Sequence, residues 1–144
     1  MNLVILDANF LLVPSQFGVD IYDEIRMQLT GSFQFVYVPE VIDELKNKQN
    51  RSSSKKFKRS VDLALKLLEF NMSAKSQNFL INPPNKPQSI PVDEYLIKLA
   101  QNFLEQNIET VYIATNDKEL KKSALTHGIR VIYLRQKKFI ELSV

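Results

Sequence analysis

Four acidic residues have the types and positions needed for a metal site: Asp7, Glu44, Asp93 and Asp117. Asp7 follows the apolar run 3–6, and Asp117 comes shortly after the apolar run 110–114. A run that is apolar throughout is typical of a strand buried on both faces of a parallel sheet. Such sheets bind ligands beyond the carboxyl ends of their strands, where the strand order reverses. If these two strands are neighbours, we expect Asp7 and Asp117 to face each other there.

Carboxylates that converge repel one another, and a cation is needed to neutralise them. Ligation by oxygen alone suits Mg²⁺ or Mn²⁺ and argues against zinc. A metal held in this way activates water and stabilises charge on a phosphate group. The four residues therefore indicate hydrolysis of a phosphate ester.

Each acidic residue also has a purely structural interpretation. Asp7 could form a turn, and Asp117 could occupy the first turn of a helix. Glu44 could be a solvated helix residue, while Asp93 could cap a helix and leave Glu94 as the ligand. These alternatives stay open for each residue alone. It is much less expected that all four residues would fall at the same edge of the sheet by accident.

The elements that must position these residues alternate along the chain. We expect strands at 3–6, 33–38, 78–81, 110–114 and 129–134, with a further edge strand within 137–144. Helical periodicity is found in 19–29, from 39 onwards, around 57–68, in 92–103 and in 117–126. Residues 82–91 form a proline-rich loop. This alternation predicts one α/β domain, residues 1–144, with a doubly wound parallel sheet.

Basic residues are concentrated in a predicted loop at 46–59, where every ionisable side chain is positive. They are Lys46, Lys48, Arg51, Lys55, Lys56, Lys58 and Arg59. Such a cluster is typical of a surface that binds a polyanion. The alternative is a solvated loop that improves solubility. Phe57, within this cluster, could stack on a base or pack within a helix.

Composition excludes several other kinds of protein. The 144 residues include no cysteine, which excludes disulfides, thiolate zinc sites and cysteine nucleophiles. His127 is the one histidine, and the three glycines are too scattered for a phosphate-binding loop. There is neither a secretory leader pattern nor a run of membrane-spanning length, so we expect no membrane association and a cytoplasmic location.

Four segments, 6–12, 39–45, 92–100 and 114–120, resemble the four motifs of the PIN-domain nucleases, in the same order. The resemblance extends over residues 3–134. It implies a three-layer α/β/α sandwich whose five-stranded parallel sheet has the order 3-2-1-4-5. It also implies cleavage of single-stranded or structured RNA that depends on Mg²⁺ or Mn²⁺.

By position, the resemblance makes Asp7, Glu44, Asp93 and Asp117 the catalytic and metal-binding residues, with Glu94 as an alternative ligand. The polar residues that would support them are Asn9, Thr115 and Asn116. Residues 9–21 resemble stand-alone archaeal members related to the small-subunit pre-ribosomal RNA nuclease. A role in rRNA processing is therefore one expectation. A ribonuclease toxin, and a non-catalytic RNA-binding or ribosome-assembly factor, are the alternatives, and the sequence leaves open whether the protein forms a homodimer or another oligomer.

Overall fold

A computed structural model describes residues 1–74, 78–81 and 83–143. Its six strands form one sheet in the order β3-β2-β1-β4-β5-β6. In chain order they are β1 (Asn2–Leu6), β2 (Phe33–Val36), β3 (Phe79–Leu80), β4 (Thr110–Ala114), β5 (Arg130–Arg135) and β6 (Phe139–Leu142). The first five are parallel, which confirms the predicted order 3-2-1-4-5. The sixth pairs antiparallel with β5, so the sheet as a whole is mixed.

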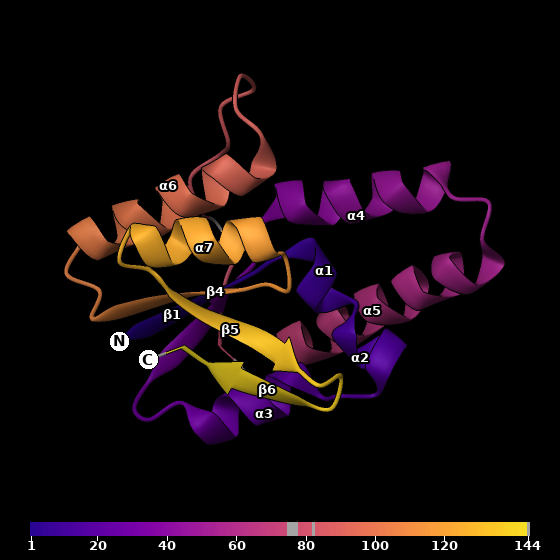
Figure 1. Ribbon diagram of the computed structural model, residues 1–144, viewed down its shortest axis with the longest axis horizontal. Helices are drawn as coiled ribbons and strands as arrows, with labels where there is room; N and C mark the ends of the chain where they lie inside the picture. The colour runs from indigo at the N-terminus through magenta and orange to yellow at the C-terminus, as the bar shows by residue number, and fades with distance from the viewer. Residues whose placement is uncertain (75–77, 82, 144) are drawn as a thin grey trace.

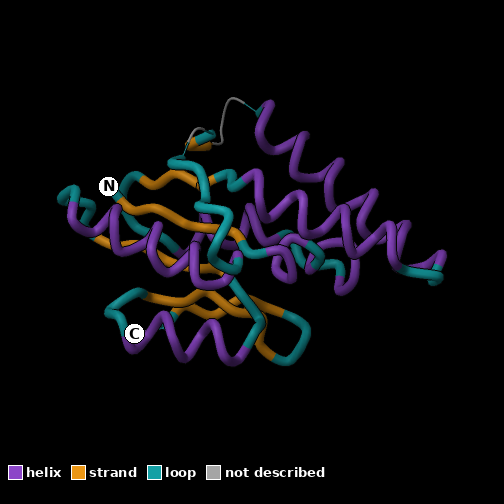
Figure 2. Tube along the Cα trace, turned by 90° about the horizontal axis from the view of Figure 1, so that it is seen from above, coloured by secondary structure: helices purple, strands orange, loops and turns teal. Residues whose placement is uncertain are grey.

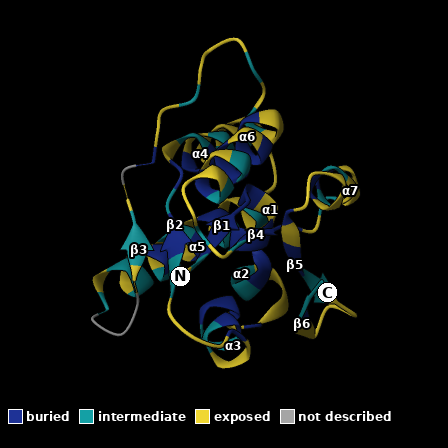
Figure 3. Cartoon of the chain, turned by 90° about the vertical axis from the view of Figure 1, so that its left-hand side faces the viewer, coloured by how far each residue is buried: buried dark blue, intermediate teal, exposed yellow. Residues whose placement is uncertain are grey.

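Helices cover the sheet on both faces, as the alternating pattern predicts. They are α1 (Ala8–Leu11), α2 (Val13–Phe17), α3 (Ile21–Gln28), α4 (Pro39–Arg51), α5 (Lys55–Ser73), α6 (Val92–Glu105) and α7 (Lys118–Thr126). Helices α6 and α7 lie on one face, against β4 and β5, and α3 lies on the other (Figures 1 and 3). Among the described residues, no helix combines the length and apolar composition needed to cross a bilayer.

Strand β1 is the centre of the core. Leu3, Val4, Ile5 and Leu6 are all buried, because β1 has a strand on each side and helices on each face. Burying one such side chain contributes about 1.5–3 kcal/mol relative to leaving it in water. The strand that ends at Asp7 therefore has little freedom to move.

Helices α4 and α5 form a hairpin that corrects one prediction. The basic segment 46–59 was expected to be a loop, but α4 continues to Arg51 and α5 starts at Lys55. Only residues 52–54 interrupt the helices, and Ser54 caps α5 by accepting a hydrogen bond from the N–H of Phe57. The hairpin reaches beyond the carboxyl ends of the strands (Figures 1 and 2). Its basic side chains are therefore carried on helices.

The proline-rich loop has no regular structure in its described part, as predicted. Glu40, at the start of α4, accepts a hydrogen bond from the N–H of Lys86 at 3.2 Å. The hydroxyl of Tyr95, in α6, donates to the carbonyl of Pro84. The loop is thereby fastened to the starts of α4 and α6.

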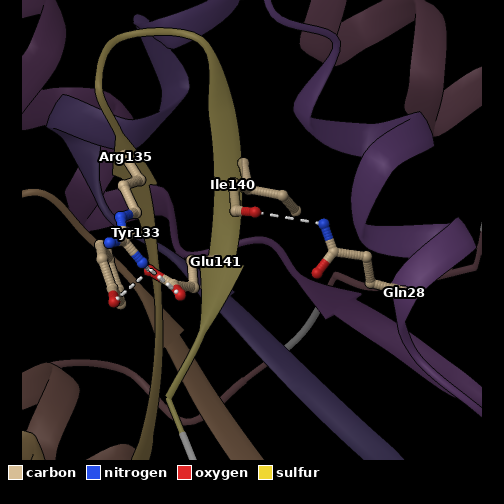
Figure 4. Close-up of polar contacts among 5 residues, drawn as sticks. All are labelled: Gln28, Tyr133, Arg135, Ile140 and Glu141. Carbon is tan, nitrogen blue, oxygen red and sulfur yellow. Dashed lines mark hydrogen bonds and ion pairs between the residues drawn. The ribbon is translucent and has the colours of Figure 1, made fainter.

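Strand β6 is held by side chains from two sides (Figure 4). Glu141 accepts hydrogen bonds from the hydroxyl of Tyr133, at 2.6 Å, and from the guanidinium of Arg135, at 2.8 Å. From the opposite side, the amide of Gln28 donates to the carbonyl of Ile140 at 3.2 Å. These bonds join β5, β6 and α3, and they close the sheet edge farthest from β3.

Candidate active site

Asp7 lies at the centre of the candidate site, directly after β1. Leu6 is paired with Ala114 in the parallel register of β1 and β4, so Asp7 comes to lie beside Thr115. Its side chain is 4% exposed and accepts two hydrogen bonds of 2.8 Å. One comes from the N–H of Ala8 and the other from the hydroxyl of Thr115. The carboxylate is thus fixed in position and almost removed from water.

Thr115 connects Asp7 with Asp117. Its buried hydroxyl donates to Asp7 and accepts from the N–H of Asp117 at 3.0 Å. Asp117 in turn caps α7, and its Oδ1 accepts from the N–H groups of Glu119 and Leu120. The structural interpretation of Asp117 as a helix-start residue is therefore correct. It is compatible with a place in the site, because the cap lies beside Thr115.

Glu44 approaches the same region from α4. One of its oxygens lies 3.4 Å from the Nζ of Lys48, one helical turn further on. The other, Oε2, is buried and has no hydrogen-bond partner among the described residues. A buried carboxylate oxygen without a partner is costly, which makes it an available ligand for a cation.

Asp93 lies in the first turn of α6 and not at its N-cap position, which is occupied by Pro91 without a side-chain capping bond. Its side chain is more exposed than its helix face predicts, since Ile97 and Ala100 on that face are buried. Partial burial and the charges of Asp117 and Glu44 raise the pKa of Asp93, while Lys48 lowers it. Asp93 therefore faces the other carboxylates from the edge of the site.

The pKa of Asp7 depends mainly on its burial and also on two of the other carboxylates. Burial raises the pKa of Asp7 from 3.8 to about 6, against the opposite effects of the bonds from Thr115 and Ala8. The charges of Asp93 and Glu44 raise it further. Together with the effects on Asp93, these interactions join Asp7, Glu44, Asp93 and Asp117 into what we call the acidic cluster.

The acidic cluster has the donor set that Mg²⁺ or Mn²⁺ prefers, since all its ligands would be carboxylate oxygens. The unpartnered Oε2 of Glu44 and the raised pKa of Asp7 both fit a site whose charge is balanced by a cation. Within residues 1–74, 78–81 and 83–143, no three acidic or histidine side chains are already close enough to hold a metal ion. Holding an ion with three of these carboxylates would therefore require their side chains to move.

Three predicted site residues are exposed and form no hydrogen bond or ion pair with the acidic cluster in the described part of the chain. The carboxylate of Glu94 is 3.6 Å from Lys98, in the next turn of α6, and is exposed. Asn9 is exposed and its side chain makes no hydrogen bond to the described residues. Asn116 accepts a hydrogen bond from the N–H of Leu134 at 2.8 Å, so it fastens β5 and does not support a carboxylate.

Two residues have a different relation to the acidic cluster than the sequence indicated. Lys48 was grouped with the RNA-binding residues, yet it pairs with Glu44 and lowers the pKa of Asp93. Glu119 was absent from the predicted site, although its charge raises the pKa of Asp93. Its position in the first turn of the helix after Asp117 was the signal that could have indicated it.

The other basic residues of 46–59 have no acidic partner within the described part of the chain. Beside them, Phe17, Lys56 and Phe57 line a cavity of about 420 Å³ between α2 and the start of α5. Phe17 is 39% exposed, and Phe57 is partly buried against the core. Phe57 therefore has the helix-packing role and also borders this cavity.

Comparison with known proteins agrees with the predicted fold and family. Ribonuclease VapC4 of Methanocaldococcus jannaschii is 29% identical over 144 residues, covering 99% of this chain and 97% of that protein. The structure of the PIN domain endonuclease Utp24 has a TM-score of 0.67 and 20% identity, with 98% of this chain and 90% of that chain covered. A family model described as a PIN like domain matches residues 4–137. The match covers nearly the whole chain, which therefore belongs to the PIN-like domain family.

Proposed function

We propose that this protein is an endoribonuclease that hydrolyses RNA phosphodiester bonds with Mg²⁺ or Mn²⁺ in the acidic cluster. The observation that carries the proposal is the geometry around the buried Asp7, which shares the hydroxyl of Thr115 with Asp117, together with the unpartnered Oε2 of Glu44. An arrangement of this kind is costly without a cation, and perturbed carboxyl groups are concentrated at functional sites. Ribonuclease VapC4, which resembles the chain over almost its whole length, supports the choice of RNA as substrate.

The residues of the site have separable roles in this proposal. Asp7, Glu44, Asp93 and Asp117 would hold the ion, which supplies charge neutralisation at the phosphate and activation of water. Thr115 keeps Asp7 and Asp117 in a fixed relation through its two hydrogen bonds. Since Asp7 and Thr115 are buried, water cannot weaken this relation.

The α4–α5 hairpin supplies the positive surface that the substrate requires. Lys46, Arg51, Lys55, Lys56, Lys58 and Arg59 are exposed, and no acidic side chain of the described residues pairs with them. Positive side chains bind RNA phosphates, and counterions are released when they do. Such side chains also steer the RNA toward the acidic cluster. Lys48, next to Glu44, would lie closest to the phosphate that is cut. Precursor ribosomal RNA is one candidate substrate, as the sequence resemblance implies.

The test compares Glu44→Gln with Asp43→Asn on the same helix. Asp43 is exposed and lies outside the acidic cluster, so its variant is the matched control. With labelled single-stranded RNA and Mn²⁺, we expect Glu44→Gln to cleave about 100-fold more slowly, the order seen when one electrostatic contributor is removed. Asp43→Asn should cleave like the wild type.

A second arm of this test separates cleavage from binding. Wild-type protein that binds RNA but leaves it intact at saturating Mn²⁺ would support the non-catalytic RNA-binding alternative. Cleavage that persists unchanged in a chelator would contradict the metal-dependent mechanism.

A further inference from the structure

A second cavity begins at the acidic cluster and runs between α6 and α7. It has a volume of about 420 Å³, and Asp93 forms part of its lining. Both helices start beside the cluster and extend in the same direction (Figure 1). From Asp93 to Gln101 the cavity follows α6 for about 12 Å, at 1.5 Å per residue. We call this cavity the α6–α7 groove.

The two ends of the α6–α7 groove differ in character. Asp93, Glu94 and Glu119 line the end nearest the acidic cluster. Lys98, which also lines the groove, is paired with Glu94, so the negative charges of Asp93 and Glu119 still disfavour a phosphate group and favour an uncharged occupant. Further along, the buried side chains of Ile97 and Leu120 provide an apolar wall.

Polar groups with unused hydrogen-bonding capacity lie at the far end. The amide of Gln101 and the hydroxyl of Ser123 form no side-chain hydrogen bond within the described part of the chain. The Nδ1 of His127 is 2.7 Å from the carbonyl of Ser123, which leaves Nε2 without a described partner. An apolar wall with a few convergent polar groups is typical of a small-molecule site. Nucleobases fit this chemistry, since they are flat and have donors and acceptors on their edges.

We propose that the α6–α7 groove binds the base of the nucleotide next to the phosphate that is cut. This inference rests on the proposed ribonuclease function, and it adds the element that selects the sequence at the cleavage site. The phosphate would remain at the acidic cluster while its base enters the groove past Asp93. Gln101, Ser123 and His127 would then read the edge of that base.

The first experiment measures the base preference at the cut. RNA with randomised sequence is cleaved in Mn²⁺, and the ends of the fragments are sequenced. The wild type should prefer one base or one pair of bases at a single position beside the cut. Gln101→Ala and Ser123→Ala should each reduce this preference by about threefold to tenfold, as expected for the loss of one hydrogen bond. Asn102→Ala is the control, because Asn102 is exposed on α6 and does not line the groove.

The second experiment needs neither metal nor cleavage. The four uncharged nucleosides, adenosine, guanosine, cytidine and uridine, are titrated into the metal-free protein and followed by NMR. At least one of them should shift the side-chain amide signals of Gln101, and Ser123→Leu, which fills the groove, should abolish the shift.

The outcomes separate the two proposals. Cleavage without base preference, together with no nucleoside shift, would overturn the groove and leave the ribonuclease function intact. Nucleoside binding that Ser123→Leu abolishes, in a protein that never cleaves RNA, would refute the ribonuclease function and with it the role of the groove at a cut, leaving a groove that binds bases only. An unchanged preference in both alanine variants would also overturn the groove.

Discussion

The charge of Asp7 should make the metal-free protein less stable as the pH rises. Burial raises the pKa of Asp7 from 3.8 to about 6, so the folded chain binds a proton more strongly than the unfolded chain. Stability from this group is therefore complete below pH 3.8 and is lost as the pH rises to about 6. One pKa unit corresponds to 1.36 kcal/mol, so the free energy of unfolding lost above pH 6 is about 3 kcal/mol.

Asp7→Asn isolates this effect because it changes the charge with little change of shape. The amide oxygen can still accept from the N–H of Ala8. The hydroxyl of Thr115, a donor to Asp7 in the wild type, can rotate and accept from the amide nitrogen. In chelator we expect the variant to exceed the wild type by up to about 3 kcal/mol at pH 7.5 and by little at pH 3.5.

The assay is urea unfolding between pH 3.5 and 7.5, followed by circular dichroism because the chain has no tryptophan. Some pH dependence should remain in both proteins, since the pKa of Asp93 is also raised. Asp43→Asn, which removes an exposed carboxylate outside the acidic cluster, serves as the control and should not reproduce the effect of Asp7→Asn. A difference between Asp7→Asn and the wild type that is the same at both ends of the range would refute the reasoning.

Three other measurements test the site and the basic surface. Mn²⁺ at a hundredfold its Kd should raise the free energy of unfolding by about 2.7 kcal/mol; thermal melts that do not move at saturating metal would contradict a cation site. Asp117→Asn should keep the cap of α7 and lower the free energy of unfolding by at most about 1 kcal/mol. The affinity for Mn²⁺, measured by titration, and the rate of RNA cleavage should both fall, and intact cleavage would make Asp117 a structural residue only. Replacing Lys55, Lys56, Lys58 and Arg59 with Ala should reduce the slope of log binding constant against log salt concentration by about two to three, because each single-strand phosphate contact contributes about 0.7. The binding of labelled RNA is measured by fluorescence anisotropy, and an unchanged slope would assign these residues a solubilising role only.

The sheet was predictable because its central strands are short apolar runs with few alternatives. Strands β1 and β4 are buried on both faces, and the parallel order followed from their alternation with helices. Residues 8–17 were harder, since Pro14 and the apolar run around it gave no clear period. In the structure they form α1 and α2, with Asp7 capping α1 and Pro14 in the first turn of α2. Both features act within one or two turns, below the window in which helical period is detectable.

The basic segment was misjudged for a different reason. A run of like charges interrupted by serines is typical of a loop, yet α4 and α5 extend through most of it. Side chains on a helix point outward in several directions, so positive charges that are neighbours in the sequence are kept apart and remain hydrated. A helix can therefore carry this run of like charges. Ser52 and Ser54 cap the ends of the two helices at this break.

The candidate site was predictable where strand register decides the position and uncertain where side-chain direction decides it. Register alone places Asp7 next to Thr115, and the helix that follows brings in Asp117. Direction separated Asp93 from Glu94, because one carboxylate interacts with the cluster and the other pairs with Lys98. The side chain of Asn116 likewise points to the backbone of β5, where it accepts a hydrogen bond from Leu134, and not to the acidic cluster.

The connection between Asp7, Thr115 and Asp117 shows why the fold tolerates a costly group at its centre. A buried carboxyl with a pKa of about 6 opposes folding at neutral pH, and hydrophobic replacement would remove that opposition. Thr115 would then lose the partner for its hydroxyl, while the N–H of Asp117 would depend on a hydroxyl with no fixed orientation. The cost of burying the Asp7 carboxyl is therefore part of the junction of β1 and β4, where the strand register defines the positions of Asp7 and Thr115. In the proposed mechanism, a carboxylate fixed at this junction would hold negative charge in place for a cation.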